Sequence, residues 1–124
     1  MQSRRGEKAI NSYEKAITIA RACLEKKAED VKILDIRKIS SISDFFVICS
    51  ASSTRRTETI KDAVDQKLRL NNCRVWHEEG RSPGTWIILD YSDVIVHIFH
   101  EQVRKFYNLD RLWGDADLVM LNDK

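Results

Sequence analysis

The sequence predicts one α/β domain, in which a single mixed β-sheet of about five strands carries helices packed on it. Its length of 124 residues fits one domain. Helical and strand patterns follow each other in the order α-β-β-α-β-β-β-α. Residues 45–49 (FFVIC) are apolar at every position, which is typical of a central strand covered on both faces.

The first helix should follow a polar lead-in, residues 1–10, and begin near Asn11. Asn11 and Glu14 have the spacing of a capping box, in which each side chain bonds to the other residue's backbone N–H. The helix should end within residues 25–28. Apolar residues at helical spacing predict its buried stripe: Tyr13, Ile17, Ala20 and Leu24.

The first strand is expected at residues 31–36, with a polar turn at 38–44 before the central strand. Ser53 or Thr54 could cap a second helix, because a hydroxyl oxygen accepts from the free N–H groups of a first turn. Residues 71–72 (NN) should end this helix. Its predicted buried stripe is Ile60, Ala63, Val64 and Leu68.

The second half of the chain predicts three more strands, at residues 74–78, 85–90 and 94–99. A short helix is expected at 101–107. The domain should therefore span residues 11–116, and residues 117–124 should form a C-terminal tail.

Residues 85–99 predict a hairpin, because two β-rich runs flank a very short connection. With residues 91–92 (YS) as a two-residue loop, Asp90 faces Asp93, Ile88 faces Ile95 and Trp86 faces His97. Like charges directly opposite each other are unfavourable without compensation. A longer loop would change these pairings.

Each pair in this hairpin has two interpretations. Asp90 and Asp93 could form an acidic spot for a basic partner or a metal, or they could bond nearby backbone as turn residues do. Trp86 and His97 could form an exposed docking patch, since tryptophan is enriched in binding hot spots, or they could be part of the core. The segment after the sheet also has two interpretations: it packs on the core, or it forms the rim of such a docking patch. The residues concerned are Arg104, Tyr107, Leu112 and Trp113.

Charge and cysteine content narrow the class of protein. A formal net charge of +2 is too balanced for a protein that holds nucleic acid mainly through phosphates. The 3 cysteines are odd in number and show no CxxC spacing, so disulfides and zinc sites are disfavoured. The charged N-terminus leads into no apolar core of a signal peptide, and no run reaches the ~18 apolar residues of a membrane span. We expect a cytoplasmic protein that does not bind membranes.

Signals for catalysis are weak, and we expect no enzyme, no metal and no cofactor. Residues 50–54 (SASST) follow a buried strand and open a helix, where backbone N–H groups could bind an anion. No P-loop, GxGxxG or GxSxG motif is present, and His77, His97 and His100 lack zinc-protease spacing. The alternative is a nucleotidyltransferase-like, metal-dependent enzyme. A third possibility is direct RNA binding by a local patch of Arg55, Arg56 and Lys61.

Three segments resemble the ribosomal silencing factor family, also called Iojap-like. They are residues 44–50 (DFFVICS), 84–99 (GTWIILDYSDVIVHIF) and 104–116 (RKFYNLDRLWGDA), and the resemblance covers roughly residues 12–116. The chain departs from the family's usual glycine at two positions, Ala51 and Ser92. Ser92 makes the hairpin geometry uncertain, and Ala51 weakens any close approach of a phosphate at that turn.

The resemblance implies a nucleotidyltransferase-like fold without catalytic machinery. It implies binding to the large ribosomal subunit through large-subunit ribosomal protein fourteen, on the surface that meets the small subunit. A protein bound on that surface would sterically block subunit association and repress translation, with no need for direct contact to nucleic acid. A homodimer is implied for the free protein. The partner-binding candidates carried over are Trp86, Asp90, Asp93, His97, Arg104, Tyr107, Leu112 and Trp113.

Overall fold

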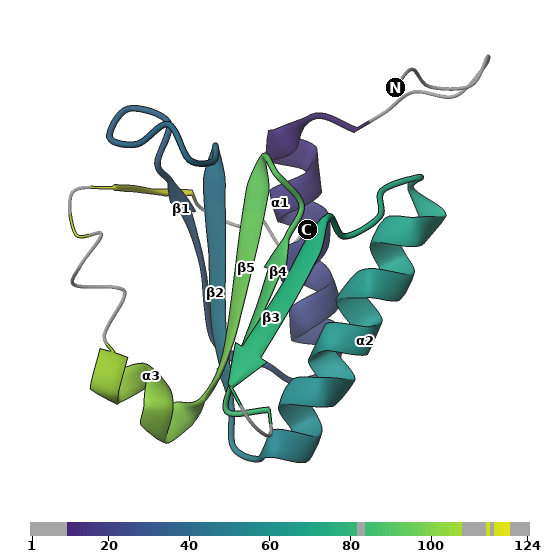
Figure 1. The fold of residues 1–124 in the computed structure, drawn as a ribbon, viewed down its shortest axis with the longest axis vertical. Coiled ribbons are helices and arrows are strands. Elements are labelled where there is room, and N and C mark those ends of the chain that lie inside the picture. The colour runs from purple at the N-terminus through teal and green to yellow at the C-terminus, as the bar shows by residue number, and fades with distance from the viewer. Residues whose placement is uncertain (1–9, 82–83, 108–113, 115, 120–124) are drawn as a thin grey trace.

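The computed structural model describes residues 10–81, 84–107, 114 and 116–119 (Figure 1). The first half of the chain forms α1 (Ser12–Glu25), β1 (Glu29–Asp35), β2 (Phe45–Ala51) and α2 (Thr54–Leu70). The second half forms β3 (His77–Arg81), β4 (Trp86–Asp90), β5 (Val94–His100), α3 (Glu101–Tyr107) and β6 (Asp117–Val119). The α/β class and the single mixed sheet with packed helices are confirmed.

The six strands form one sheet in the order β3-β4-β5-β2-β1-β6. The central pair, β2 and β5, is parallel, and each of the other neighbours is antiparallel. Every residue of β2 is buried, as its uniformly apolar sequence predicted. The sheet is therefore two antiparallel parts joined through a buried parallel centre.

Helices α1 and α2 lie side by side over one face of the sheet (Figure 1). The predicted capping box at the start of α1 is present: the Asn11 side chain accepts from the Glu14 N–H, and the Glu14 side chain accepts from the Asn11 N–H. Ser53 caps α2 by accepting from the Arg56 N–H, and Asn71 ends this helix. Both helix starts are thus fixed by short polar side chains, as expected.

The predicted stripe of α1 is confirmed at Ala20, with Ile17 partly buried against the core, and was wrong at Tyr13 and Leu24. Tyr13 and Leu24 are 49% and 44% exposed. The other buried side chains are the small Ala16, Ala22 and Cys23 with Ile19. Small residues let the helix lie close to the sheet, and this close approach outweighs the larger apolar side chains. In α2 the stripe is confirmed at Ile60, Val64 and Leu68, but Thr57 is buried and Ala63 only half-buried.

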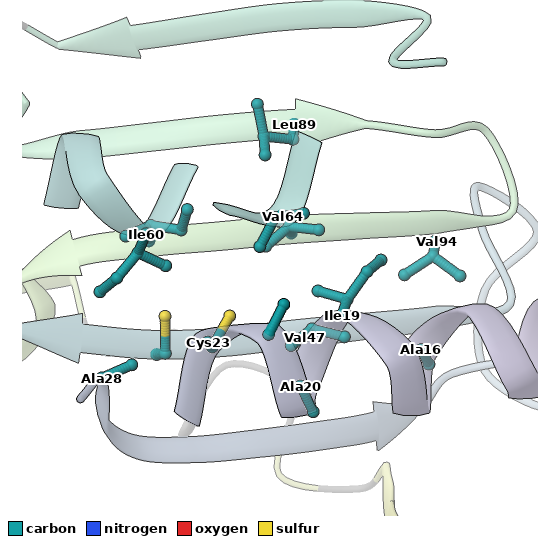
Figure 2. Packing of buried hydrophobic residues seen from close by; sticks show 14 of the residues in the cluster. Ala16, Ile19, Ala20, Cys23, Ala28, Val47, Ile60, Val64, Leu89 and Val94 are labelled. Atoms are coloured by element: carbon teal, nitrogen blue, oxygen red, sulfur yellow. The ribbon is translucent and has the colours of Figure 1, made fainter. Parts of the chain in front are cut away.

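The main core fills the space between the two helices and the sheet (Figure 2). Ile19 and Cys23 of α1 and Ile60 and Val64 of α2 meet strand residues such as Val47, Leu89 and Val94. Gly84 packs against the first turn of α2 and has a backbone φ of 77°. A Cβ at this position would lie 2.9 Å from the Thr57 hydroxyl. Glycine is therefore required where β4 begins.

A second, smaller apolar cluster lies on the opposite face of the sheet. Its buried members are Leu34, Ile36, Phe46, Ile48 and Phe99. Val103 of α3 packs against it, so that α3 and the α1–α2 layer lie on opposite faces (Figure 1). Trp86 and Ile95 belong to the same cluster but are only partly buried.

Several strand predictions differ from the structure. The first strand spans Glu29–Asp35 instead of residues 31–36. The third strand begins at His77 instead of residue 74, because residues 71–76 form a turn and an irregular segment after α2. Residues 117–119, assigned to a tail, form β6 against β1. The hairpin register is shifted: Trp86 opposes Phe99, and Asp90 opposes Ile95. The loop is Ser92-Asp93, with Ser92 at a backbone φ of 78°, a conformation that glycine adopts most easily.

Candidate functional site

Trp86 and His97 meet on the second face of the sheet even though they are not directly opposite. The Trp86 Nε1–H donates a hydrogen bond of 3.2 Å to Nδ1 of His97. The Trp86 ring also stacks on Phe99, with ring centroids 4.9 Å apart. Phe46 of the neighbouring strand meets the His97 ring edge-on at 4.9 Å. The indole is therefore held in one orientation by its stacking on Phe99 and its hydrogen bond to His97, whose ring is in turn packed against Phe46.

His97 is a neutral, buried member of this cluster. It is 8% exposed, and burial lowers its pKa to about 4. Because Nδ1 accepts from Trp86, the ring proton belongs on Nε2. Within the part of the chain that the structure describes, buried Nε2 has no hydrogen-bond partner. His97 thus positions Trp86 and carries no charge at neutral pH.

Three half-buried apolar side chains of β4 and β5 lie on this face: Trp86, Ile88 and Ile95. Strand pairing places Ile88 beside His97 and Ile95 beside Asp90. We name the surface of Trp86, Ile88 and Ile95 the Trp86 face. Its rings and branched side chains are fixed from below by a buried layer, so it offers apolar area at a low cost in side-chain entropy.

The two aspartates of the hairpin bond within the chain. Asp90 Oδ1 accepts from the Ser92 N–H at 2.7 Å, which is the turn chemistry that the sequence left open. Asp93 Oδ1 lies 2.7 Å from Nζ of Lys15 in α1. The register keeps the two aspartates out of directly opposed positions, so the expected like-charge conflict does not arise.

Arg104 is buried and its contacts are internal. Its Nη1 donates to the Asp30 carbonyl oxygen at 2.7 Å and to the Ser50 hydroxyl at 2.8 Å. Nη2 also lies 3.4 Å from the Asp30 carboxylate. These bonds tie α3 to β1 and β2. Of the other predicted residues, Leu112 and Trp113 lie outside the described residues, as does the side chain of Tyr107.

Several exposed apolar residues were not singled out from the sequence. Trp76 is 75% exposed just before β3, where its backbone N–H donates to the Asp90 carbonyl oxygen. Ile39 and Ile42, in the β1–β2 connection, are 44% and 58% exposed. A tryptophan within the otherwise largely polar run of residues 71–81 was the signal that could have drawn attention to Trp76.

Neither a metal cluster nor a membrane span is found in the described ranges. Across them, His, Cys, Asp and Glu side chains do not gather in groups of three or more. None of the described helices has the length and apolar character to cross a bilayer.

The fold and the Trp86 face define a small α/β protein with an apolar surface on the sheet face opposite its two long helices. A family model described as "Ribosomal silencing factor during starvation" matches residues 9–124. The chain belongs to this ribosomal silencing factor family, as the resemblance indicated.

Curated relatives and solved structures agree with this assignment. A Bacillus subtilis protein named ribosomal silencing factor RsfS is 39% identical over 103 residues, which are 83% of this chain and 87% of the relative. A maize protein named "Protein Iojap, chloroplastic" is 34% identical over 109 residues, 86% of this chain and 46% of the relative. A crystal structure from Bacillus halodurans has a TM-score of 0.73 at 32% identity, covering 88% of this chain and 96% of the other. A Chromobacterium violaceum structure, 24% identical, has the same fold, with a TM-score of 0.82 over 93% and 95% of the two chains.

Proposed function

We propose that the protein binds the large ribosomal subunit through large-subunit ribosomal protein fourteen and thereby blocks association with the small subunit. Membership in the family supports a role in translation regulation. The observation that carries the proposal is the Trp86 face, an apolar surface whose indole is held by His97 and Phe99. Inhibition would be steric: a bound domain occupies space that the small subunit needs, and translation is repressed.

The Trp86 face has the physical character of a binding hot spot. An aromatic side chain that is already ordered loses little entropy on binding, so more of the buried apolar area contributes to affinity. Trp86, Ile88 and Ile95 supply that area, and buried His97 and Phe99 keep it rigid. The role of His97 is thus to position Trp86 from below.

Asp90 and Asp93 would contribute charge beside the apolar surface. Each has a carboxylate oxygen engaged inside the chain, and the Asp93 side chain remains 36% exposed. A basic ribosomal protein would be attracted by this charge mainly before docking, which raises the association rate more than the final affinity. Arg104, Tyr107, Leu112 and Trp113 stay predictions as partner contacts, and for Arg104 the internal bonds favour a structural role.

The remaining expectations from the family also belong to the proposal. The protein would act in the cytoplasm, where it meets free large subunits, and it would form a homodimer when it is not bound. Binding to the ribosomal protein would need no resident cofactor and no catalytic step.

The test is cosedimentation with isolated large subunits, with Ile88→Lys as the variant. This substitution places a charge on the Trp86 face and leaves the buried layer below it in place. We expect loss of cosedimentation and loss of inhibition when small subunits are titrated. Leu70→Lys is the matched control, since Leu70 is 77% exposed at the end of α2 in the opposite layer. Wild-type protein that fails to sediment with large subunits, or two variants that bind equally well, would refute the proposal.

A further inference from the structure

Four basic residues lie in the two segments where α1 ends and α2 begins. Lys26 and Lys27 follow the last turn of α1, and Arg55 and Arg56 lie in the first turn of α2. Nη1 of Arg56 donates to the Lys26 carbonyl oxygen at 3.3 Å, which joins the two segments. In Figure 1 both segments lie toward the lower end of the sheet, within the α1–α2 layer. We name these four residues the basic corner.

The basic corner contrasts with several cations in the described part of the chain that do have carboxylate partners. Lys15 pairs with Asp93, Arg69 with Asp65, and Lys61 with both Glu58 and Glu78. Within the described ranges, none of the four residues of the corner forms an ion pair. Glu25 and Glu29 flank its α1 half in sequence, and Glu58, which follows its α2 half, is paired with Lys61. Positive charge is therefore in excess there, although the whole chain carries a net charge of only +2.

The sequence predicted a basic patch that includes Lys61, but the structure shows that Lys61 does not contribute free positive charge to it. The Lys61 ammonium lies 3.2 Å from the Glu58 carboxylate and 3.4 Å from that of Glu78, so its charge is balanced locally. The segment of Lys26 and Lys27, which is distant from α2 in sequence, instead lies next to Arg56 through the hydrogen bond to the Lys26 carbonyl oxygen. The folded chain thus gathers cations that the sequence keeps apart.

A surface hollow of about 150 Å³ lies within the corner, lined by Ser53, Arg55, Arg56 and Thr59. Guanidinium and hydroxyl groups are the donors that most often contact phosphate oxygens in nucleic-acid complexes. Lys26 adjoins this lining through its backbone, because its carbonyl oxygen accepts from Arg56. A chain of phosphates, in which charge repeats at a fixed spacing, fits this arrangement better than one isolated anion.

We propose that the basic corner binds the sugar–phosphate backbone of RNA. This inference rests on the proposed function in one respect, namely that the RNA would be ribosomal RNA next to the docking site. The corner lies in the helix layer and the Trp86 face on the opposite side of the sheet, so they are separate surfaces. Protein contacts on the Trp86 face would select the position, and phosphate contacts at the corner would add salt-dependent, sequence-independent affinity.

The test measures fluorescence anisotropy of a labelled RNA hairpin over a series of salt concentrations. Arg56→Glu is the main variant, because Ser53 with a glutamate at residue 56 has capping-box spacing and α2 should remain stable. We expect roughly fivefold or greater loss of RNA affinity and a salt slope shallower by about 1. Arg55→Gln, which removes one charge without reversal, should weaken binding less. Arg74→Glu, an exposed site in the loop after α2, is the matched control and should keep wild-type affinity.

Three results would overturn the inference: no RNA binding by wild-type protein at low salt, equal losses for Arg56→Glu and Arg74→Glu, or displacement of the RNA by polyglutamate at equal charge concentration. The last would assign the corner to acidic protein segments. Large-subunit cosedimentation separates this inference from the proposed function. Ile88→Lys should lose the subunit but keep the RNA hairpin, whereas Arg56→Glu should lose the hairpin and bind the subunit with a shallower salt slope.

Discussion

The Trp86 indole donates its hydrogen bond to a histidine that is neutral because it is buried, so one ring fixes the orientation of the other. The bond needs an unprotonated Nδ1 on His97. Orientation of the Trp86 face and protonation of His97 are therefore linked, and the linkage can be measured through stability.

Acid should destabilise the protein through His97. The folded-state pKa of about 4 lies below the value of about 6.5 for an unfolded chain, so the unfolded state binds the extra proton between them. The contribution to the free energy of unfolding is complete above about pH 6.5 and falls as the pH drops toward 4, by roughly 3 kcal/mol. Urea unfolding at a series of pH values measures this loss. His97→Phe should flatten the profile and His77→Phe, at an exposed site, should not; parallel profiles for wild type and His97→Phe would contradict the linkage.

Arg104 should be important for stability. Arg104→Ala leaves the Asp30 carbonyl oxygen and the Ser50 hydroxyl without their buried charged donor. We expect the free energy of unfolding to fall by about 2–4 kcal/mol. Chemical denaturation measures it, with exposed Lys105→Ala as the control, which should change stability by less than about 0.5 kcal/mol. A loss below about 1 kcal/mol for Arg104→Ala, together with weaker large-subunit binding, would assign Arg104 to the binding surface.

The ion pair between Lys15 and Asp93 should stabilise the hairpin loop against α1. The Lys15 side chain is 11% exposed and that of Asp93 36%, so solvent screens the pair only in part. A double-mutant cycle with Lys15→Met and Asp93→Asn should give a coupling of about 0.5–1 kcal/mol. The coupling should decrease in high salt. Zero coupling at low salt would mean that the pair contributes nothing to stability and that the Asp93 carboxylate remains available to a partner.

Cysteine reactivity should report on the core. Cys23 and Cys49 are buried, and a hydrogen bond with Cys49, together with burial, raises the pKa of the Cys23 thiol. Cys73 is only half-buried, although burial raises its pKa too. A thiol reagent should therefore label one residue per folded chain, slowly, and all three in denaturant. Cys73→Ser should abolish labelling of the folded protein; fast labelling of Cys23 or Cys49 would show that the core opens.

Elements with strong local signals were predictable from sequence. The capping box at Asn11, the hydroxyl cap at Ser53 and the helix Glu101–Tyr107 depend on neighbouring residues only, and each is present. The two-sided apolar run of β2 was equally informative. Such features are fixed by interactions within one turn or one strand.

Features that depend on distant partners were not predictable. β6 has three residues and exists through its pairing with β1. The stripe of α1 was misplaced because close packing on the sheet favours alanines over the larger Tyr13 and Leu24. The hairpin register depended on Ser92, which adopts a left-handed backbone conformation.

The Trp86 face was predictable only in part, because its contacts also depend on residues that are distant in sequence. Trp86 and His97 were paired by sequence, and they do meet, but by a diagonal contact in another register. The internal bonds of Asp93 and Arg104 involve Lys15, Asp30 and Ser50, which are distant in sequence. Only tertiary structure reveals such partners.

The parallel pairing of β2 with β5 has a consequence for biosynthesis. Phe45 can meet Val94 only after both α2 and the β3–β4 segment have been made. A nascent chain therefore cannot close the middle of its sheet until most of it has left the exit tunnel, and Phe46 and Ile48 stay uncovered until then. A chain that belongs to a family of ribosomal regulators completes its fold late in its own translation.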